Sequence, residues 1–183
     1  KQSFTQRKDR GEFIRVALVG YTNVGKSSLF SALSGKPVLI KNQLFSTLET
    51  TVGRMANQPR ILMVDTIGFI DNVPAELLDS FSATLQESLS CDMLLLLVDA
   101  SDDSDEIRRK LATSRRELFG RINDENNPET LVVLTKIDLC SAEQIIEAEE
   151  IVHFYSPFES LSVSSATGQG IDELRSGIMT ILH

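Results

Sequence analysis

The sequence of 183 residues predicts an α/β domain with a six-stranded, mostly parallel sheet, one antiparallel edge strand and helices on both faces. The first observation is that short apolar segments alternate with helix-length segments from residue 13 onward, which is the pattern of repeated strand–helix units. The second is that a glycine-rich segment lies directly between the first apolar segment and the first helix-like segment. We expect one domain over residues 13–183, with residues 1–12 as a linker from an upstream region that this chain lacks.

The expected strands follow the short apolar segments, and the expected helices follow the longer segments between them. The strands are residues 14–19, 51–57, 60–65, 93–98, 130–135 and 158–163. Only Gln58 and Pro59 separate the second strand from the third, which is too short for a crossover helix, so this pair should form an antiparallel hairpin at one sheet edge. The helices are residues 26–34, 74–89, 104–122, 141–150 and 171–182. In such a sheet, ligands collect at the carboxyl ends of the strands.

Composition and charge exclude several classes of function. The formal net charge of −8 argues against generic binding to nucleic-acid phosphates, so the basic residues within 1–10 and 108–116 are interpreted as a solvated tail and a solvated helix face. The apolar segment 93–98 is far shorter than the ~20 residues that cross a bilayer. Cys91 and Cys140 match no metal-binding or redox spacing, and no signal peptide opens the chain. We expect a monomeric, cytoplasmic domain without membrane contact.

The segment after the first strand has the pattern GxxxxGK[ST]. It reads Gly20-Tyr21-Thr22-Asn23-Val24-Gly25-Lys26-Ser27, followed by Ser28. Its glycines let the backbone curl so that successive N–H groups point at phosphate oxygens, and the following helix adds its own N-terminal donors. Lys26 would reach the β- and γ-phosphates, and the Ser27 hydroxyl would ligate Mg²⁺. A strand-to-helix turn without function is the alternative, which the complete match in this context disfavours.

A second motif follows the third strand. It reads Asp65-Thr66-Ile67-Gly68, a DxxG arrangement. The Asp65 carboxylate can hold Mg²⁺ through a water molecule, and the Gly68 N–H can contact the γ-phosphate. An aspartate after a strand is by itself more often a turn or cap residue. Following a phosphate loop at this distance, however, it predicts a nucleotide site.

A third motif, Thr135-Lys136-Ile137-Asp138, follows the strand 130–135 and resembles the guanine-recognition motif NKxD, with threonine in place of asparagine. Asp138 would accept hydrogen bonds from N1 and N2 of guanine, which adenine does not offer, and the Lys136 stem would lie along the base. A hydroxyl can still donate or accept, so Thr135 should preserve base specificity with weaker support to the loop. The alternative is that Asp138 merely caps the helix that follows.

The loop after the last strand carries a fourth motif, which resembles the pattern SAxxGxG of GTPases. Its first residues are Ser164, Ser165 and Ala166. In that pattern, backbone N–H groups contact the guanine O6. Serine at position 165 replaces alanine, which is a modest departure because the contact belongs to the backbone.

Four motifs in this order predict the three-layer P-loop NTPase fold of Ras-like G domains, and three segments resemble one family of such GTPases, the HflX family. The phosphate loop through Phe30 closely resembles the phosphate loop of that family. Residues 44–51 are similar to its switch I segment, LFATLDPTT. Residues 65–70 and 81–87 are similar to its segments DTVGFI and AFxATLEE, so the resemblance covers about residues 14–175.

The resemblance implies roles for a segment without strong periodicity. Residues Phe45-Ser46-Thr47-Leu48-Glu49 would cover the nucleotide. The hydroxyl and backbone of Thr47 would meet Mg²⁺ and the γ-phosphate, although Thr50 or Thr51 could be the ligand instead. Thr50 replaces the proline of the family, which would otherwise restrict φ. The resemblance also implies association with the large ribosomal subunit through regions that are partly missing here, and GTP hydrolysis stimulated by the ribosome.

The catalytic groups that remain predict slow intrinsic turnover. Phe69 lies where many GTPases have the glutamine that orients the attacking water, and phenylalanine has no hydrogen-bonding capacity. Lys26, Thr47, Gly68 and the phosphate-loop N–H groups then supply electrostatic stabilisation. Related GTPases with a GxxNxGKS loop use the asparagine to ligate K⁺, which makes Asn23 a candidate K⁺ ligand.

Three classes of function therefore stay open. The first is a Mg²⁺-dependent switch that hydrolyses GTP to GDP and phosphate. The second is a GTP-gated binding module with negligible turnover, which the phenylalanine at position 69 favours. The third is a P-loop ATPase or kinase, which the two guanine-recognition motifs disfavour.

Overall fold

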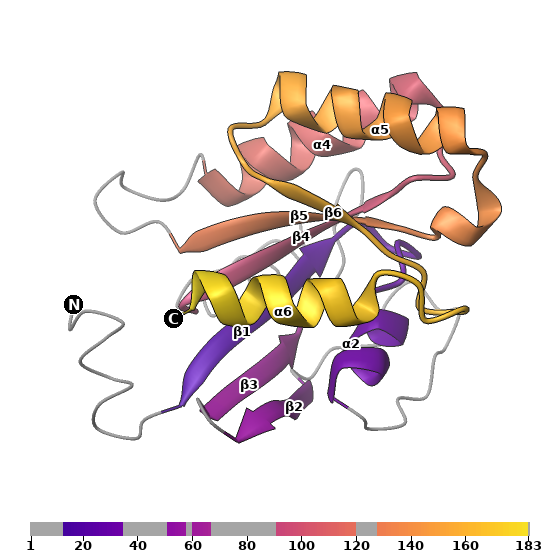
Figure 1. The fold of residues 1–183 in the computed structure, drawn as a ribbon. Coiled ribbons are helices and arrows are strands. Elements are labelled where there is room, and N and C mark those ends of the chain that lie inside the picture. The colour runs from indigo at the N-terminus through magenta and orange to yellow at the C-terminus, as the bar shows by residue number, and fades with distance from the viewer. Residues whose placement is uncertain (1–12, 35–50, 58–59, 67–90, 120–127, 183) are drawn as a thin grey trace.

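The computed structural model describes residues 13–34, 51–57, 60–66, 91–119 and 128–182 (Figure 1). Its sheet has six strands in the order β2-β3-β1-β4-β5-β6. The strands are β1 (Ile14–Gly20), β2 (Thr51–Asn57), β3 (Arg60–Asp65), β4 (Met93–Asp99), β5 (Glu129–Thr135) and β6 (Ser160–Ser162). The helices are α2 (Lys26–Ser34), α4 (Ser104–Phe119), the 3₁₀ helix η3 (Ile137–Leu139), α5 (Ala142–Tyr155) and α6 (Ile171–Ile181).

The pairing of the strands agrees with the predicted topology. Strand β2 pairs with β3 antiparallel at one edge of the sheet, and every other neighbouring pair is parallel. A bulge between Arg54 and Ala56 shifts the register of the antiparallel pair. The predicted hairpin and the mostly parallel α/β sheet are therefore confirmed.

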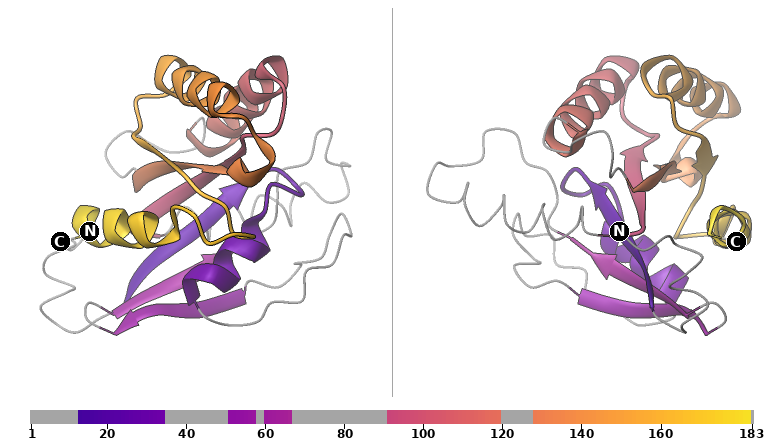
Figure 2. Two further views of the ribbon diagram at one scale, coloured as in Figure 1. Left: turned by 45° about the vertical axis from the view of Figure 1, so that its right-hand side comes forward. Right: turned by 90° about the vertical axis from the view of Figure 1, so that its left-hand side faces the viewer.

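Helices cover both faces of the sheet (Figure 1, Figure 2). Helices α2 and α6 pack on one face, and α4 and α5 pack on the other. Strand β4 shows why both faces are apolar: its odd-numbered residues Met93, Leu95 and Leu97 join the α2–α6 core, and Leu94 and Leu96 join the α4–α5 core. A parallel strand buried on both sides is apolar at every position, because side chains alternate between the two faces.

Two predicted elements, the helix at 141–150 and the strand at 158–163, differ from the structure at both ends. Helix α5 begins one residue later than predicted, because Ser141 is its N-cap, and it continues to Tyr155 because Ile151 and Val152 lie in the core. Strand β6 covers residues 160–162 instead of 158–163. The Phe158 N–H donates to the Ser156 hydroxyl in a local turn (3.1 Å). Because this N–H is used locally, Phe158 does not pair with β5, and the strand begins after it.

Other predictions fall partly or wholly outside the described residues. The helix expected at 74–89 lies there entirely, as do the last three residues of the helix expected at 104–122. Within the part of the chain that the structure describes, no helix has the length and apolar character that crossing a bilayer requires.

The fold brings the ends of four strands to one edge of the sheet. Gly20, Asp65, Asp99 and Thr135 are the last residues of β1, β3, β4 and β5. Register places Asp99 beside Thr135 and Leu97 beside Gly20. Polar groups from distant parts of the sequence therefore meet where an open parallel sheet binds its ligands.

Candidate functional site

The loop between β1 and α2 has the curled backbone that its sequence predicts. Asn23 and Gly25 have positive φ angles of 61° and 100°, in the left-handed region. Glycine adopts this conformation without the steric penalty that other residues meet. The first turn of α2 starts directly from the loop, because the Leu29 N–H donates to the Gly25 carbonyl (2.9 Å). The helix N-terminus and the loop N–H groups together form a region suited to an anion.

The side chain of Tyr21 belongs to the core beneath this loop. It is 5% exposed and packs on the α4 side of the sheet. The guanidinium carbon of Arg109 and the ammonium nitrogen of Lys110 lie 5.6 Å and 5.7 Å from its ring centroid. Tyr21 could therefore contact a ligand through its backbone, while its ring joins the loop to helix α4.

Lys26, Ser27 and Asp65 meet at the start of α2. The Ser27 hydroxyl donates to Oδ2 of the buried Asp65 (3.1 Å). Burial raises the pKa of Asp65, and the charge of Lys26 and the hydrogen bond from Ser27 oppose that shift. Burial also lowers the pKa of Lys26, and the charge of Asp65 opposes it. The charged form of each of these two side chains is therefore stabilised by the opposite charge of the other, or by a charged ligand.

One oxygen of the Asp65 carboxylate has no hydrogen-bond partner within the described residues. This atom, Oδ1, is buried. Buried polar atoms are normally paired, so an orphan oxygen beside a serine hydroxyl suits a hard cation or its water ligand. The neighbouring Thr66 hydroxyl is already used, because it donates to the Leu18 carbonyl (2.6 Å). In the part of the chain that is described, no three or more His, Cys, Asp or Glu side chains are arranged so that together they could hold a metal ion.

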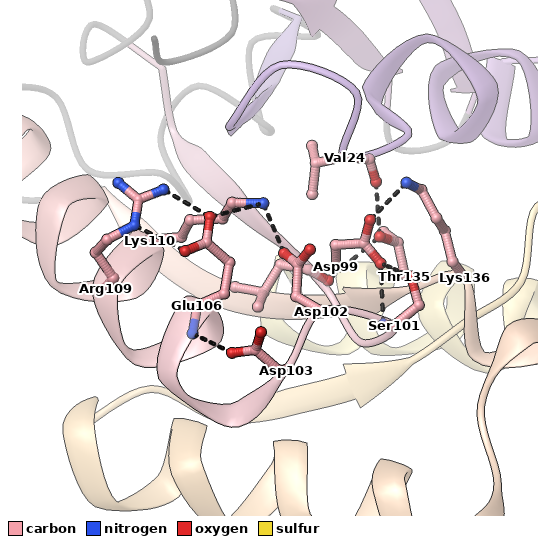
Figure 3. A network of polar contacts seen from close by, with 11 residues as sticks. Val24, Asp99, Ser101, Asp102, Asp103, Glu106, Arg109, Lys110, Thr135 and Lys136 are labelled. Atoms are coloured by element: carbon pink, nitrogen blue, oxygen red, sulfur yellow. Dashed lines mark hydrogen bonds and ion pairs between the residues drawn. The ribbon is translucent and has the colours of Figure 1, made fainter. Parts of the chain in front are cut away.

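Thr135 joins the predicted base-recognition loop to the phosphate loop. Its buried hydroxyl lies 2.6 Å from the Val24 carbonyl oxygen and 3.2 Å from the Val98 carbonyl oxygen (Figure 3). The shorter contact spans 111 positions of sequence. The short threonine side chain is therefore long enough to connect the end of β5 to the phosphate loop.

Lys136 follows with an unusual backbone conformation, φ 60° and ψ 32°. Its ammonium nitrogen lies 2.5 Å from Oδ2 of Asp99 at the end of β4 (Figure 3). Asp99 is 7% exposed. The ion pair thus joins the buried Asp99 carboxylate to the loop that follows β5.

Asp138 is held by a residue of the last loop. The Ser164 hydroxyl donates to Oδ1 of Asp138 (2.5 Å), and the Ser164 oxygen also accepts from the Thr167 N–H (3.1 Å). Ser164 is fully buried, whereas Asp138 is exposed. Helix α5 is capped by Ser141 in a reciprocal capping box with Gln144, so Asp138 is not the N-cap of that helix.

A cleft of about 600 Å³ joins these segments. Its walls come from the phosphate loop and helix α2, from the end of β5 with the loop after it, and from the loop after β6. The lining residues are Gly25, Ser28, Ser31, Ala32, Thr135, Lys136, Asp138, Leu139, Ser165 and Ala166. The volume lies in the range of small-ligand pockets.

Several predicted site residues lie outside the described residues. They are Phe45, Ser46, Thr47, Leu48, Glu49, Ile67, Gly68 and Phe69. The structure brings together Lys26, Ser27 and Asp65 at one place and Thr135, Lys136 and Asp138 at the other. The residues that the sequence analysis missed are Asp99, which pairs with Lys136, and the lining residues Ser31, Ala32 and Leu139. The position of Asp99 at the end of an apolar strand, like that of Asp65, is the signal that could have found it.

Comparison with known proteins gives one consistent result. Residues 15–136 match the family described as 50S ribosome-binding GTPase. The chain is 42% identical over 139 residues to the GTPase HflX of Methanocaldococcus jannaschii, which covers 75% of this chain and 34% of that protein. It is 36% identical over 185 residues to the GTPase HflX of Thermofilum pendens, which covers 100% of this chain and 42% of that protein.

A solved structure extends the likeness to the fold. The crystal structure of a GTP-binding protein from the hyperthermophilic archaeon Sulfolobus solfataricus in complex with GDP matches with a TM-score of 0.73 and 28% identity. The match covers 92% of this chain and 52% of that one. The chain thus spans about half of that structure and less than half of each of the two relatives named above.

Proposed function

Because this chain belongs to the 50S ribosome-binding GTPase family and to the HflX GTPases, we propose that it is a G domain that binds GTP and hydrolyses it to GDP and phosphate. The observation that carries the proposal is the single cleft lined by both phosphate-loop and base-recognition residues. Gly25 and Ser28 line it together with Lys136 and Asp138. A nucleotide needs both kinds of contact at once.

Guanine specificity is assigned to Asp138. Its carboxylate would accept hydrogen bonds from N1 and N2 of the base, and it has acceptor capacity beyond the bond from Ser164. The backbone N–H groups of residues 165 and 166 would contact O6. Adenine presents the opposite pattern of donors and acceptors, so this arrangement favours GTP over ATP.

Mg²⁺ fits the oxygen donors beside the phosphate loop. Ser27 would ligate the ion directly and Asp65 would hold it through water, with Thr47 as the further ligand expected from the sequence. The orphan Oδ1 of Asp65 and the serine hydroxyl beside Oδ2 support this assignment. When bound, the ion would neutralise phosphate charge and stabilise the leaving group.

The groups of this chain suggest slow hydrolysis without a partner. Lys26 would contact the β- and γ-phosphates, and their charge would favour its ammonium form against the burial that lowers its pKa. The Gly68 N–H would contact the γ-phosphate, while Phe69 cannot orient the attacking water. Stimulation by the large ribosomal subunit is proposed on the family match.

K⁺ is proposed as an activating cation at Asn23. The side chain is exposed and its backbone has a positive φ of 61°, at the bend of the phosphate loop. Hydrolysis should be faster in K⁺ than in Na⁺ buffer at equal ionic strength. Equal rates in the two buffers would remove Asn23 from the mechanism.

The central experiment measures nucleotide specificity. GDP should bind and resist competition by ATP, and Asp138→Asn should weaken GDP binding and favour xanthosine diphosphate, because the amide offers a donor to the xanthine O2. Asp105→Asn is the matched control, because Asp105 is exposed on α4 and pairs with Arg108. Unchanged GDP affinity in the Asp138 variant would refute the assignment.

A second candidate function is a GTP-gated binding module with negligible turnover. The phenylalanine in place of a catalytic glutamine favours it. Steady-state phosphate release, with and without large ribosomal subunits, separates the two functions. Tight GTP binding with no phosphate release under either condition would support the module.

A further inference from the structure

We propose that Asp99 is a positioning residue for guanine recognition, which acts by holding Lys136 against the base-binding wall of the cleft. This inference rests on the proposed function, because it concerns the same cleft. Lys136 lines the cleft. Asp99 is not among the lining residues, and its carboxylate contacts the ammonium group of the lining residue Lys136.

The sheet register places the two residues together. Asp99 is the last residue of β4 and lies beside Thr135, and the Ala100 N–H donates to the Thr135 carbonyl (3.0 Å). The next residue, Lys136, can therefore turn its ammonium group back toward Asp99 at 2.5 Å (Figure 3). The ion pair therefore follows from the hydrogen-bonded pairing of β4 with β5, which fixes the backbone next to both residues.

The carboxylate of Asp99 is held in one orientation. Its Oδ1 accepts hydrogen bonds from the backbone N–H of Ser101 (3.0 Å) and from the Ser101 hydroxyl (2.6 Å). This leaves Oδ2 for the ammonium group of Lys136, as Figure 3 shows. Hydrogen bonds with charged partners are short and directional, so the position of the ammonium group is well defined.

A defined ammonium position matters because lysine is otherwise mobile. Its four-carbon stem loses rotamer freedom whenever it is ordered by a ligand. Asp99 orders the stem before the base arrives, so guanine binding meets a smaller entropic penalty. Lys136 also has a left-handed backbone, which non-glycine residues rarely adopt.

The test is a double-mutant cycle on GDP affinity and dissociation rate. Asp99→Asn and Lys136→Met should each weaken GDP binding about 3- to 10-fold, mainly through faster dissociation. The effect is moderate because the Lys136 side chain is 34% exposed, so solvent partly screens the ion pair. The double variant should bind like Lys136→Met alone, because Asp99 acts through that lysine. Asp99→Glu should restore part of the affinity, and Ser101→Ala should lose less than Asp99→Asn.

Asp105→Asn controls for the loss of one negative charge and should bind GDP like the wild type. A variant with a much lower Tm is replaced by Ser101→Ala, which keeps the carboxylate and loosens its orientation. If the fold-losses of GDP affinity of the two single variants multiplied in the double variant, or if Asp99→Asn bound GDP like the wild type, the role of Asp99 would be overturned and the proposed function would stand. Failure of the wild type to bind GDP would overturn the proposed function as well.

Discussion

Replacing Thr135 by valine should loosen the connection between the two halves of the nucleotide cleft. Valine has nearly the same shape but no hydroxyl, so the backbone should keep its strand conformation. The change removes the donor to the Val24 carbonyl at 2.6 Å and the longer contact to the Val98 carbonyl at 3.2 Å. Both are buried contacts, so water does not readily replace the lost donor.

The magnitude follows from the burial of these groups. Losing a neutral hydrogen bond and leaving a buried carbonyl unsatisfied costs about 1–3 kcal/mol of the free energy of unfolding. For a domain of this size each kcal/mol lowers Tm by about 2–4 °C, so a loss of about 2 kcal/mol predicts a fall of about 4–8 °C. We also expect GDP to bind about fivefold more weakly, because the base-recognition loop is no longer tied to the phosphate loop.

Thermal unfolding without nucleotide and a GDP titration measure the two effects. Thr130→Val is the matched control on the same strand, since its hydroxyl makes only a 3.1 Å contact to the Pro128 carbonyl and is half-buried. The control should change Tm little and leave GDP affinity unchanged. If the two variants gave the same Tm and the same GDP affinity, the connection through Thr135 would have no energetic role.

Three further predictions concern other parts of the structure. Gly170→Ala should destabilise the domain by more than about 2 kcal/mol, because φ is 73° and an added Cβ would lie 2.2 Å from the Ser162 carbonyl oxygen. Urea unfolding measures this loss, and a free energy of unfolding equal to that of the wild type would contradict the close approach. Arg175→Met should lower Tm by about 2–8 °C, because the guanidinium donates to two carbonyls in the last turn of α2 at 3.0 Å each. An unchanged Tm in thermal unfolding would show that water replaces these contacts. Burial raises the pKa of Cys91 to about 12, so at pH 8 its thiolate fraction is very small and iodoacetamide should label it slowly until urea is added. Peptide mass spectrometry of the folded and the urea-unfolded protein would contradict this if Cys91 were labelled equally fast in both.

The sequence determined the strands and the motifs because their causes are local. A continuous apolar segment of this short length, such as residues 93–98, is typical of a strand buried on both faces, and the structure confirms it within β4. The short connection at Gln58 and Pro59 requires an antiparallel pair, which β2 and β3 form. The phosphate loop has the curled conformation that its glycines permit. Each of these follows from neighbours within a few positions of the chain.

Element ends were less predictable, because packing decides them. Helix α5 continues five residues beyond the predicted end, where burial of Ile151 and Val152 stabilises a further turn. Strand β6 is shorter than its apolar pattern suggests, because it pairs only with β5 in the described sheet. Helix and strand propensities do not contain this information.

Only the tertiary structure decided which side chains support the site. Ser164 holds Asp138 across 26 positions, Asp99 pairs with Lys136 across 37, and Thr135 reaches Val24 across 111. These pairs depend on strand order and register, which bring distant carboxyl ends to one edge of the sheet. A motif names the group that would meet the nucleotide, whereas the neighbour that orients that group is set by the pairing of whole strands.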